Sequence, residues 1–235
     1  MKLTIDLKTD NKSKYFDFMN QLKPEYNHIT ELVVKNLKDT DYGFLSDNTT
    51  IESISLPDTL IIGNSFLITE NNIKKVYLPK VEKIGDGFLS YNKFIKEIDL
   101  PNIKTIGDSF LARIKTLAKI SFPNLQTAGN DFFEMIETTS EINLPKLKFV
   151  GDNFLRSCKG IKELNLPDLE KTGNSFMSLN STLENLYVPK LKKYKKGFLS
   201  CNSKFNYFNC STKYPSKKRD ENTIQLIKQN YDKLY

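Results

Sequence analysis

The sequence predicts an α/β repeat solenoid made of about eight 22-residue units. An apolar residue followed by proline recurs at a fixed interval, at Leu56-Pro57, Leu78-Pro79, Leu100-Pro101, Phe122-Pro123, Leu144-Pro145, Leu166-Pro167 and Val188-Pro189. Phenylalanine keeps the same interval, at Phe44, Phe66, Phe88, Phe110, Phe132, Phe154, Phe176 and Phe198. A period without insertions is typical of stacked units, because each unit buries its apolar face on its neighbours.

The first part of each unit is predicted to be a half-buried strand. In the unit IKEIDLPNIKTIGDSFLARIKT, residues 95–116, the apolar Ile98 and Leu100 alternate with Glu97 and Asp99. Pro101 ends the strand because it has no N–H to donate to a neighbouring strand. Since no unit carries an insertion, we expect one parallel sheet without a break between Ile51 and Val188.

The second part of the unit is predicted to turn a corner and drop a phenylalanine into the core. Ile103 and Ile106 point inward again, and Gly107 forms a sharp corner where a side chain would be costly. Asp108 occupies a helix N-cap position and is followed by a single helical turn that buries Phe110. The equivalent cap positions hold Asn64, Asp86, Asn130, Asp152 and Asn174. The segment lacks the Gly-Lys-Ser/Thr ending of a phosphate-binding loop, so the repeat predicts a structural corner.

Three regions are expected along the chain. Residues 1–28 form an N-terminal cap with a short helix ending at Pro24, and residues 29–205 form the solenoid. Residues 206–235 form a C-terminal cap with a basic segment and a helix over 221–235, which has Ile224, Ile227, Tyr231 and Leu234 on one face.

Composition is that of a folded protein, with 39% hydrophobic and 27% charged residues. No apolar run reaches the roughly 18 residues of a membrane span. The first ten residues lack the apolar stretch of a secretory signal, so a cytoplasmic site is expected over the cell surface. From Lys190 onward, 12 Lys and Arg face three acids, a net charge of +9. The first 189 residues therefore carry −2, because the whole chain carries +7.

Few residues suit catalysis or metal binding. His28 is the only histidine, which rules out a two-histidine metal site, and it is interpreted as a junction residue. Cys158, Cys201 and Cys210 have no metal-type spacing and are interpreted as reduced, with a Cys201–Cys210 disulfide as the alternative. The sequence therefore predicts no enzymatic activity, no metal site and no cofactor.

The unit L/I-x-x-I-x-L-P-x-L-x-x-I-G-[DN]-x-F-L resembles the leucine-rich repeats of the BspA-like class over residues 29–205. The resemblance implies a horseshoe or arc with a parallel sheet on the concave face, and we place the short helical turns on the convex face. It also implies a protein that binds other proteins and is not an enzyme. The family commonly has a cysteine a few residues after the phenylalanine. This chain has one at Cys158, whereas Asn92, Asn180 and Asn202 replace it elsewhere.

Two columns of outward strand residues on the concave face are the predicted partner-binding surface. One contains Tyr77, Asp99, Ser121, Asn143, Asn165 and Tyr187, and the other contains Lys75, Glu97, Lys119, Glu141 and Glu163. Tyrosines are good contact residues because they bring large area at low entropic cost. Glu141 and Glu163 share a column, but interspersed lysines favour a solvated charged face over paired catalytic carboxylates or a calcium site. A polar surface of mixed sign suits a protein or peptide, and a solvated sheet without a partner is the alternative.

The basic C-terminal end predicts a second surface. Its candidate anion-binding residues are Lys190, Lys192, Lys193, Lys195, Lys196, Lys217, Lys218 and Arg219. Such a cluster suits weak, salt-dependent contact with nucleic acid or an acidic membrane, or it only solubilises the chain. The leading hypothesis is a non-enzymatic scaffold that binds a protein or peptide through the concave sheet. A structural subunit that associates with itself and an anion-binding protein are the alternatives.

Overall fold

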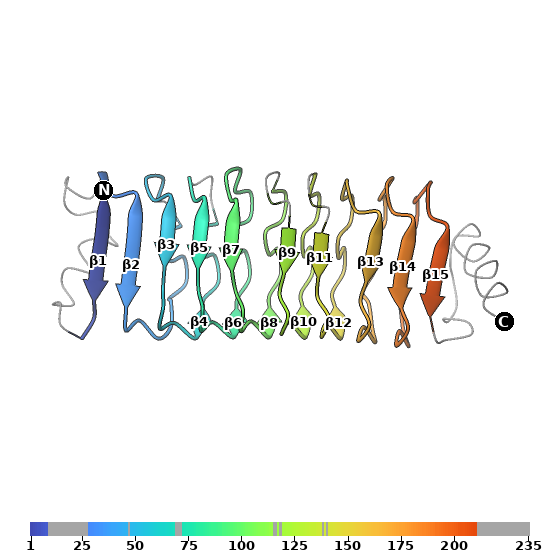
Figure 1. Ribbon diagram of the computed structural model, residues 1–235, viewed down its shortest axis with the longest axis horizontal. Coiled ribbons are helices and arrows are strands. Elements are labelled where there is room, and N and C mark those ends of the chain that lie inside the picture. The colour runs from blue at the N-terminus through green and yellow to red at the C-terminus, as the bar shows by residue number, and fades with distance from the viewer. Residues whose placement is uncertain are drawn as a thin grey trace.

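The computed structural model describes residues 1–8, 28–46, 48–68, 72–114, 117, 119–137, 139 and 141–210. Over these residues the chain winds into a parallel β-solenoid of about eight turns, with one turn per 22-residue unit (Figure 1). The predicted solenoid and its period are therefore confirmed. In the same residues, no helix is long and apolar enough to cross a membrane.

One side of the solenoid is a row of strands that we call the front row. In the described residues it consists of β1 (Lys2–Asp6), β2 (Glu31–Lys35), β3 (Ser53–Ser55), β5 (Lys75–Tyr77), β7 (Glu97–Asp99), β9 (Lys119–Ser121), β11 (Glu141–Asn143), β13 (Glu163–Asn165), β14 (Asn185–Val188) and β15 (Tyr207–Cys210). Figure 1 shows these strands side by side from the N-terminal to the C-terminal end. From β2 to β15, paired residues lie one unit apart, as Lys75 and Glu97 do.

A second row of shorter strands follows the proline of each unit. It contains β4 (Ile61–Ile62), β6 (Lys83–Ile84), β8 (Thr105–Ile106), β10 (Thr127–Ala128) and β12 (Phe149–Val150), which form one five-stranded parallel sheet. Single bridges continue this row from Phe149 to Lys171 and from Lys171 to Lys193. The extended run predicted around Ile106 is therefore a strand of its own.

The phenylalanine spine forms the centre of the core, as predicted. All eight side chains of the spine are at most 2% exposed. Neighbouring rings stack with centroids 5.1–5.5 Å apart and planes within 2–14° of each other. Offset stacks at this distance are the favourable arrangement for aromatic pairs. Each turn is therefore fixed to the next by ring contacts as well as by backbone hydrogen bonds.

The predicted helical turns on the convex face are wrong. Ser109, Leu111 and Arg113 have φ of 55°, 49° and 62°, so left-handed residues alternate along the segment that was expected to be helical. A right-handed helix needs negative φ at consecutive residues. The backbone instead bonds to the adjacent turns, as from Leu111 N to Phe88 O at 3.0 Å. The segment is a stacked turn because its hydrogen-bond partners lie in other units.

The glycine corner has a different cause from the one expected. A Cβ at Gly107 would lie 2.7 Å from the carbonyl carbon of Gly85 and 2.9 Å from the backbone nitrogen of Asp86. Two turns of backbone thus approach each other too closely for any side chain. The Asp108 carboxylate lies beside the next such corner, at Gly129, accepts a hydrogen bond from the backbone N–H of Asn130 at 2.7 Å, and does not cap a helix.

The prediction of one unbroken sheet from Ile51 to Val188 is wrong for the front row. Hydrogen bonding divides the row into three sheets, β1-β2-β3-β5-β7, β9-β11 and β13-β14-β15. Leu78 N donates to Asp99 O at 3.1 Å, whereas the equivalent bond from Leu100 N to Ser121 O is absent. The second row crosses the same interval without interruption, since β8 pairs with β10. The solenoid therefore opens on its front side only.

The loop that precedes the front-row strand differs between units. Asn92 Oδ1 accepts hydrogen bonds from the backbone N–H groups of Phe94 and Ile95 at 2.9 and 2.7 Å, and so holds the loop that leads into β7. The residues at the same position before β9 and β11 are Ile114 and Ile136, which have no amide to offer. These two strands make up the detached central sheet. The loss of this asparagine is not sufficient to separate strands, because β5 pairs on both sides although Glu70 occupies the same position before it.

Strands also extend beyond the boundaries expected for the solenoid, because β1 pairs with β2 and β15 pairs with β14. The predicted helices before Pro24 and over 221–235, and the basic residues Lys217, Lys218 and Arg219, lie outside the described residues.

Candidate interaction surface

The outward side chains of the front row form a surface that we call the front face, which corresponds to the face predicted to be concave. Alternation along each strand produces it, as in β5, where Val76 is buried while Lys75 and Tyr77 are exposed. Strand pairing one unit apart aligns the predicted residues in two columns within each sheet. We call the column that runs from Lys75 to Glu163 the charged column and the column that runs from Tyr77 to Tyr187 the polar column.

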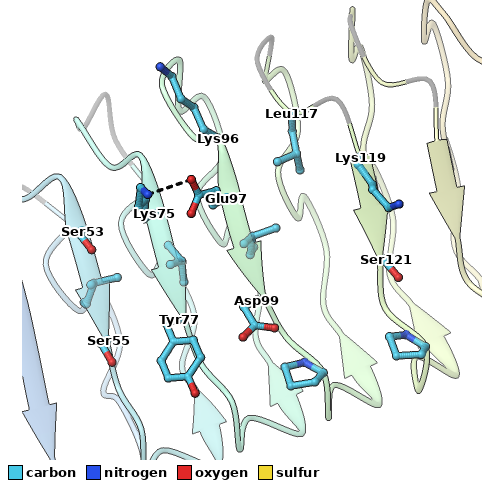
Figure 2. A pocket seen from close by; sticks show the side chains of 15 residues that line it. Ser53, Ser55, Lys75, Tyr77, Lys96, Glu97, Asp99, Leu117, Lys119 and Ser121 are labelled. Carbon is cyan, nitrogen blue, oxygen red and sulfur yellow. Dashed lines mark ion pairs between the residues drawn. The ribbon is translucent and has the colours of Figure 1, made fainter.

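The charged column consists of neighbouring pairs of opposite charge. Lys75 bonds to Glu97 at 2.9 Å, as the dashed line in Figure 2 marks, and Lys119 bonds to Glu141 at 2.9 Å. These side chains are more than half exposed, so each pair contributes about 1 kcal/mol or less to stability. The column is therefore a charge pattern that a partner can recognise.

Glu141 and Glu163 do not form a carboxylate pair. They lie on β11 and β13, which belong to different sheets. Glu141 bonds to Lys119 within its own sheet. Glu163 accepts a hydrogen bond from Asn185 Nδ2 at 2.8 Å. Each carboxylate thus has its own partner, and the structure places no shared proton between the two strands.

The polar column presents large side chains at both ends. Tyr77 is 48% exposed and Tyr187 is 37% exposed, and the Tyr187 ring lies 5.4 Å from the ring of Tyr207. Between them, Asn143 Nδ2 donates to Ser121 Oγ at 3.1 Å. Exposed tyrosines on a regular backbone offer contact area that loses little conformational freedom on binding.

Two hollows mark the front face where the sheets part. The first, of about 750 Å³, extends over β3, β5, β7 and β9, crosses the opening between β7 and β9, and includes Ile98, Asp99 and Ser121 in its lining (Figure 2). The second, of about 690 Å³, spans the opening between β11 and β13 and includes Ile142. Ile98 and Ile142 are only half-buried, although most strand-centre residues of the front row are buried.

A model of a known family fits most of the chain. Residues 26–140 and 104–217 match a family described as a BspA type leucine-rich repeat region with six copies. The chain belongs to the BspA-type leucine-rich repeat family. Comparison with curated proteins and with solved structures found no match. The resemblance predicted from the repeat unit is therefore confirmed, and the chain is a BspA-type repeat scaffold.

Carboxylates of preceding BspA-type units offset part of the predicted anion-binding patch. Its paired lysines are Lys190 with Asp168 at 2.6 Å, Lys192 with Glu170 at 2.8 Å and Lys195 with Asp152 at 3.9 Å. The hydrogen bond to Asp168 raises the pKa of Lys190. Lys193 and Lys196 are also exposed on these units. The local positive field is thus smaller than the count of lysines suggests, because three of these charges face an opposite one.

The cysteine position of the BspA-type repeat is structural in this chain. Cys158 is buried, and burial raises the pKa of its thiol to about 12. Its backbone N–H donates to Asn180 Oδ1 at 2.5 Å, which joins two units. Cys201 is exposed and Cys210 half-buried, and no disulfide joins them, as the reduced interpretation expects. Among the described residues, no group of three or more His, Cys, Asp or Glu side chains is placed to hold a metal ion.

Sequence reasoning missed the two openings and the residues they expose. The sequence feature nearest to them is the pair Ile114 and Ile136, at a position where five other units carry asparagine or cysteine and one carries Glu70. A repeat motif contains only the residues that its units share, and these two isoleucines lie at a position where the units differ. The half-buried Ile98 and Ile142 follow from the missing pairing and have no sequence signal of their own.

Proposed function

We propose that this BspA-type protein is a non-enzymatic interaction scaffold that binds a protein or peptide partner through its front face. The observation that carries the proposal is the front face itself, where two exposed tyrosines and two hollows lie on a frame of stacked turns. Membership of a repeat family supports a scaffold role, because repeat solenoids present extended binding surfaces.

The arrangement of contacts supports this assignment to the front face. The phenylalanine spine and the second row join successive turns, so the outward residues of the front row are free to vary without loss of the core. The charged column alternates in sign, as Lys75 and Glu97 do. A surface of mixed sign favours a protein or peptide over a polyanion, which requires clustered positive charge.

Affinity capture from the native source tests the proposal with one double variant and a matched control variant. The double variant Tyr77→Ala, Tyr187→Ala removes the two exposed rings of the polar column. Tyr91→Ala is the control, because Tyr91 is 49% exposed but lies outside the front row. We expect the double variant to lose the partner that the wild type and Tyr91→Ala retain, with unchanged thermal melting for all three. Equal capture by all three proteins would refute binding through the front face.

A further inference from the structure

We propose that the opening between β7 and β9 receives an extended peptide segment of the partner as an added parallel strand. This inference rests on the proposed scaffold function and specifies how the front face binds. It differs from simple surface contact because the partner's backbone, and not only its side chains, would supply hydrogen bonds.

The two strands that border the opening lack the bonds that their equivalents make. In the closed part of the front row, Leu78 N donates to Asp99 O at 3.1 Å and Lys75 N donates to Glu52 O at 3.2 Å. The corresponding bonds across the opening, from Leu100 N to Ser121 O and from Lys119 N to Lys96 O, are absent. A strand edge of this kind is a template for another strand.

The rest of the turn joins the two units behind the opening. On the second row, Gln126 N donates to Lys104 O at 2.9 Å, and beside the spine Phe133 N donates to Phe110 O at 3.2 Å. The same two units are therefore bonded behind the opening and separate in front of it. Figure 1 shows β7 and β9 set farther apart than β5 and β7. The frame thus preorganises the opening, which lowers the conformational cost of binding.

The side chains around the opening specify the peptide. A strand's residues alternate between inward and outward positions, so its central residue would point inward beside the half-buried Ile98 and is expected to be apolar. The next residue would point outward between Asp99 and Ser121, where the carboxylate favours a lysine or arginine. The preceding residue would lie between Glu97 and Lys119, which are both ion-paired to neighbours, and is expected to be polar.

The two openings differ in where their negative charge lies. The residues that flank the same outward position between β11 and β13 are Asn143 and Asn165, which are neutral. At the second opening the carboxylates, Glu141 and Glu163, flank the preceding outward position instead, so a basic residue directly after the inward one fits the opening between β7 and β9.

The test uses the full chain and a fluorescein-labelled peptide of sequence Ser-Thr-Val-Lys-Leu-Ser, with binding followed by fluorescence anisotropy. The matched control peptide has the same side chains but carries N-methyl groups on the valine and lysine amides. We expect the unmodified peptide to bind and the methylated one to bind at least about tenfold more weakly, since it lacks backbone donors. No binding, or equal binding of the two peptides, would overturn the added strand.

Two protein variants locate the site. Ser121→Arg places a positive charge beside the expected peptide lysine and should weaken binding about fivefold through like-charge repulsion. Val33→Arg makes the same change in the same column of β2, which is paired on both sides, and should leave binding unchanged. An equal effect of both variants would place the peptide elsewhere and contradict the proposal. If the peptide fails to bind while capture still depends on Tyr77 and Tyr187, the scaffold function stands and only the added strand is rejected.

Discussion

The Oδ1 atom of Asp86 accepts a hydrogen bond from the backbone N–H of Asp108, 2.8 Å away and one unit later in the chain. The same bond joins Asn64 to Asp86, Asp108 to Asn130, Asn130 to Asp152 and Asp152 to Asn174. Each acidic or amide side chain thus holds the next turn, beside the glycine corner where the two backbones meet. This ladder of side chains explains why the unit requires Asp or Asn after its glycine.

Substitution of Asp108 should show how much the hydrogen bonds of one ladder residue contribute to the free energy of unfolding. Asp108→Ala removes the acceptor for the backbone N–H of Asn130 and for Asn130 Nδ2. We expect a loss of about 0.5–1.5 kcal/mol in the free energy of unfolding, the usual net contribution of a hydrogen bond that water can replace. Asp108→Asn keeps an oxygen in place and should cost less. Equal losses in chemical denaturation would mean that the bond does not stabilise the stack.

Truncation of one ring of the spine should weaken the whole stack. Phe110 is fully buried between Phe88 and Phe132, so Phe110→Ala is expected to destabilise the protein by about 3–5 kcal/mol. Phe94→Ala is the control, because that ring is 45% exposed and its loss should change stability by about 0.5 kcal/mol or less. Urea unfolding compares the two variants, and a similar small effect for both would remove Phe110 from the core.

The glycine corner should tolerate no side chain because two backbones meet there, and a second glycine allows this effect to be separated from the cost of positive φ. At Gly107 a Cβ meets the backbone of Gly85 at 2.7 Å, whereas at Gly43 the nearest atom is 3.5 Å away and φ is +68°. Gly43→Ala therefore measures the cost of left-handed backbone alone, about 1–2 kcal/mol. Gly107→Ala should cost more than this, because the backbones of two turns must move apart. A smaller loss for Gly107→Ala in thermal unfolding would contradict the close approach.

Acid should weaken the ladder. Hydrogen bonds from the side chain and the backbone of Asn174 hold the pKa of Asp152 below its usual value. A carboxylate whose pKa is lowered by folding stabilises the protein above its unfolded pKa, and this stability is lost as the pH falls through the folded value. The wild type should therefore lose stability faster than Asp152→Asn below about pH 4. Parallel pH profiles in thermal unfolding would show that Asp152 does not contribute.

The spine and the strands could be predicted from the sequence because both are fixed by burial with a constant period. Phe110 and Leu100 recur at equal intervals, and only stacking satisfies them all. The turn after Asp108 could not be predicted from the sequence. Ser109 and Leu111 are not glycines, and they adopt left-handed φ because neighbouring turns supply hydrogen bonds. The local sequence favours a helical turn, but contacts with neighbouring turns outweigh this preference.

The openings in the front row are a second feature that depends on contacts between units and not on the sequence of one unit. Ile98 lies in a strand whose sequence matches the other units, yet it is half-buried because β9 does not pair with β7. The next unit has Ile114 in place of the loop-holding asparagine, a change that the strand itself does not carry. A repeat motif describes the average unit, and a binding surface arises where units differ.

Amide hydrogen exchange in the free protein tests most directly whether the front row is divided. Leu78 N and Leu166 N donate to the next strand at 3.1 and 2.9 Å, and their exchange should be slow. Leu100 N and Leu144 N occupy the same position at the two openings and should exchange much faster, although both side chains are buried. Equal protection of all four amides would show that the front row is a single closed sheet, and the account of its binding surface would then be wrong.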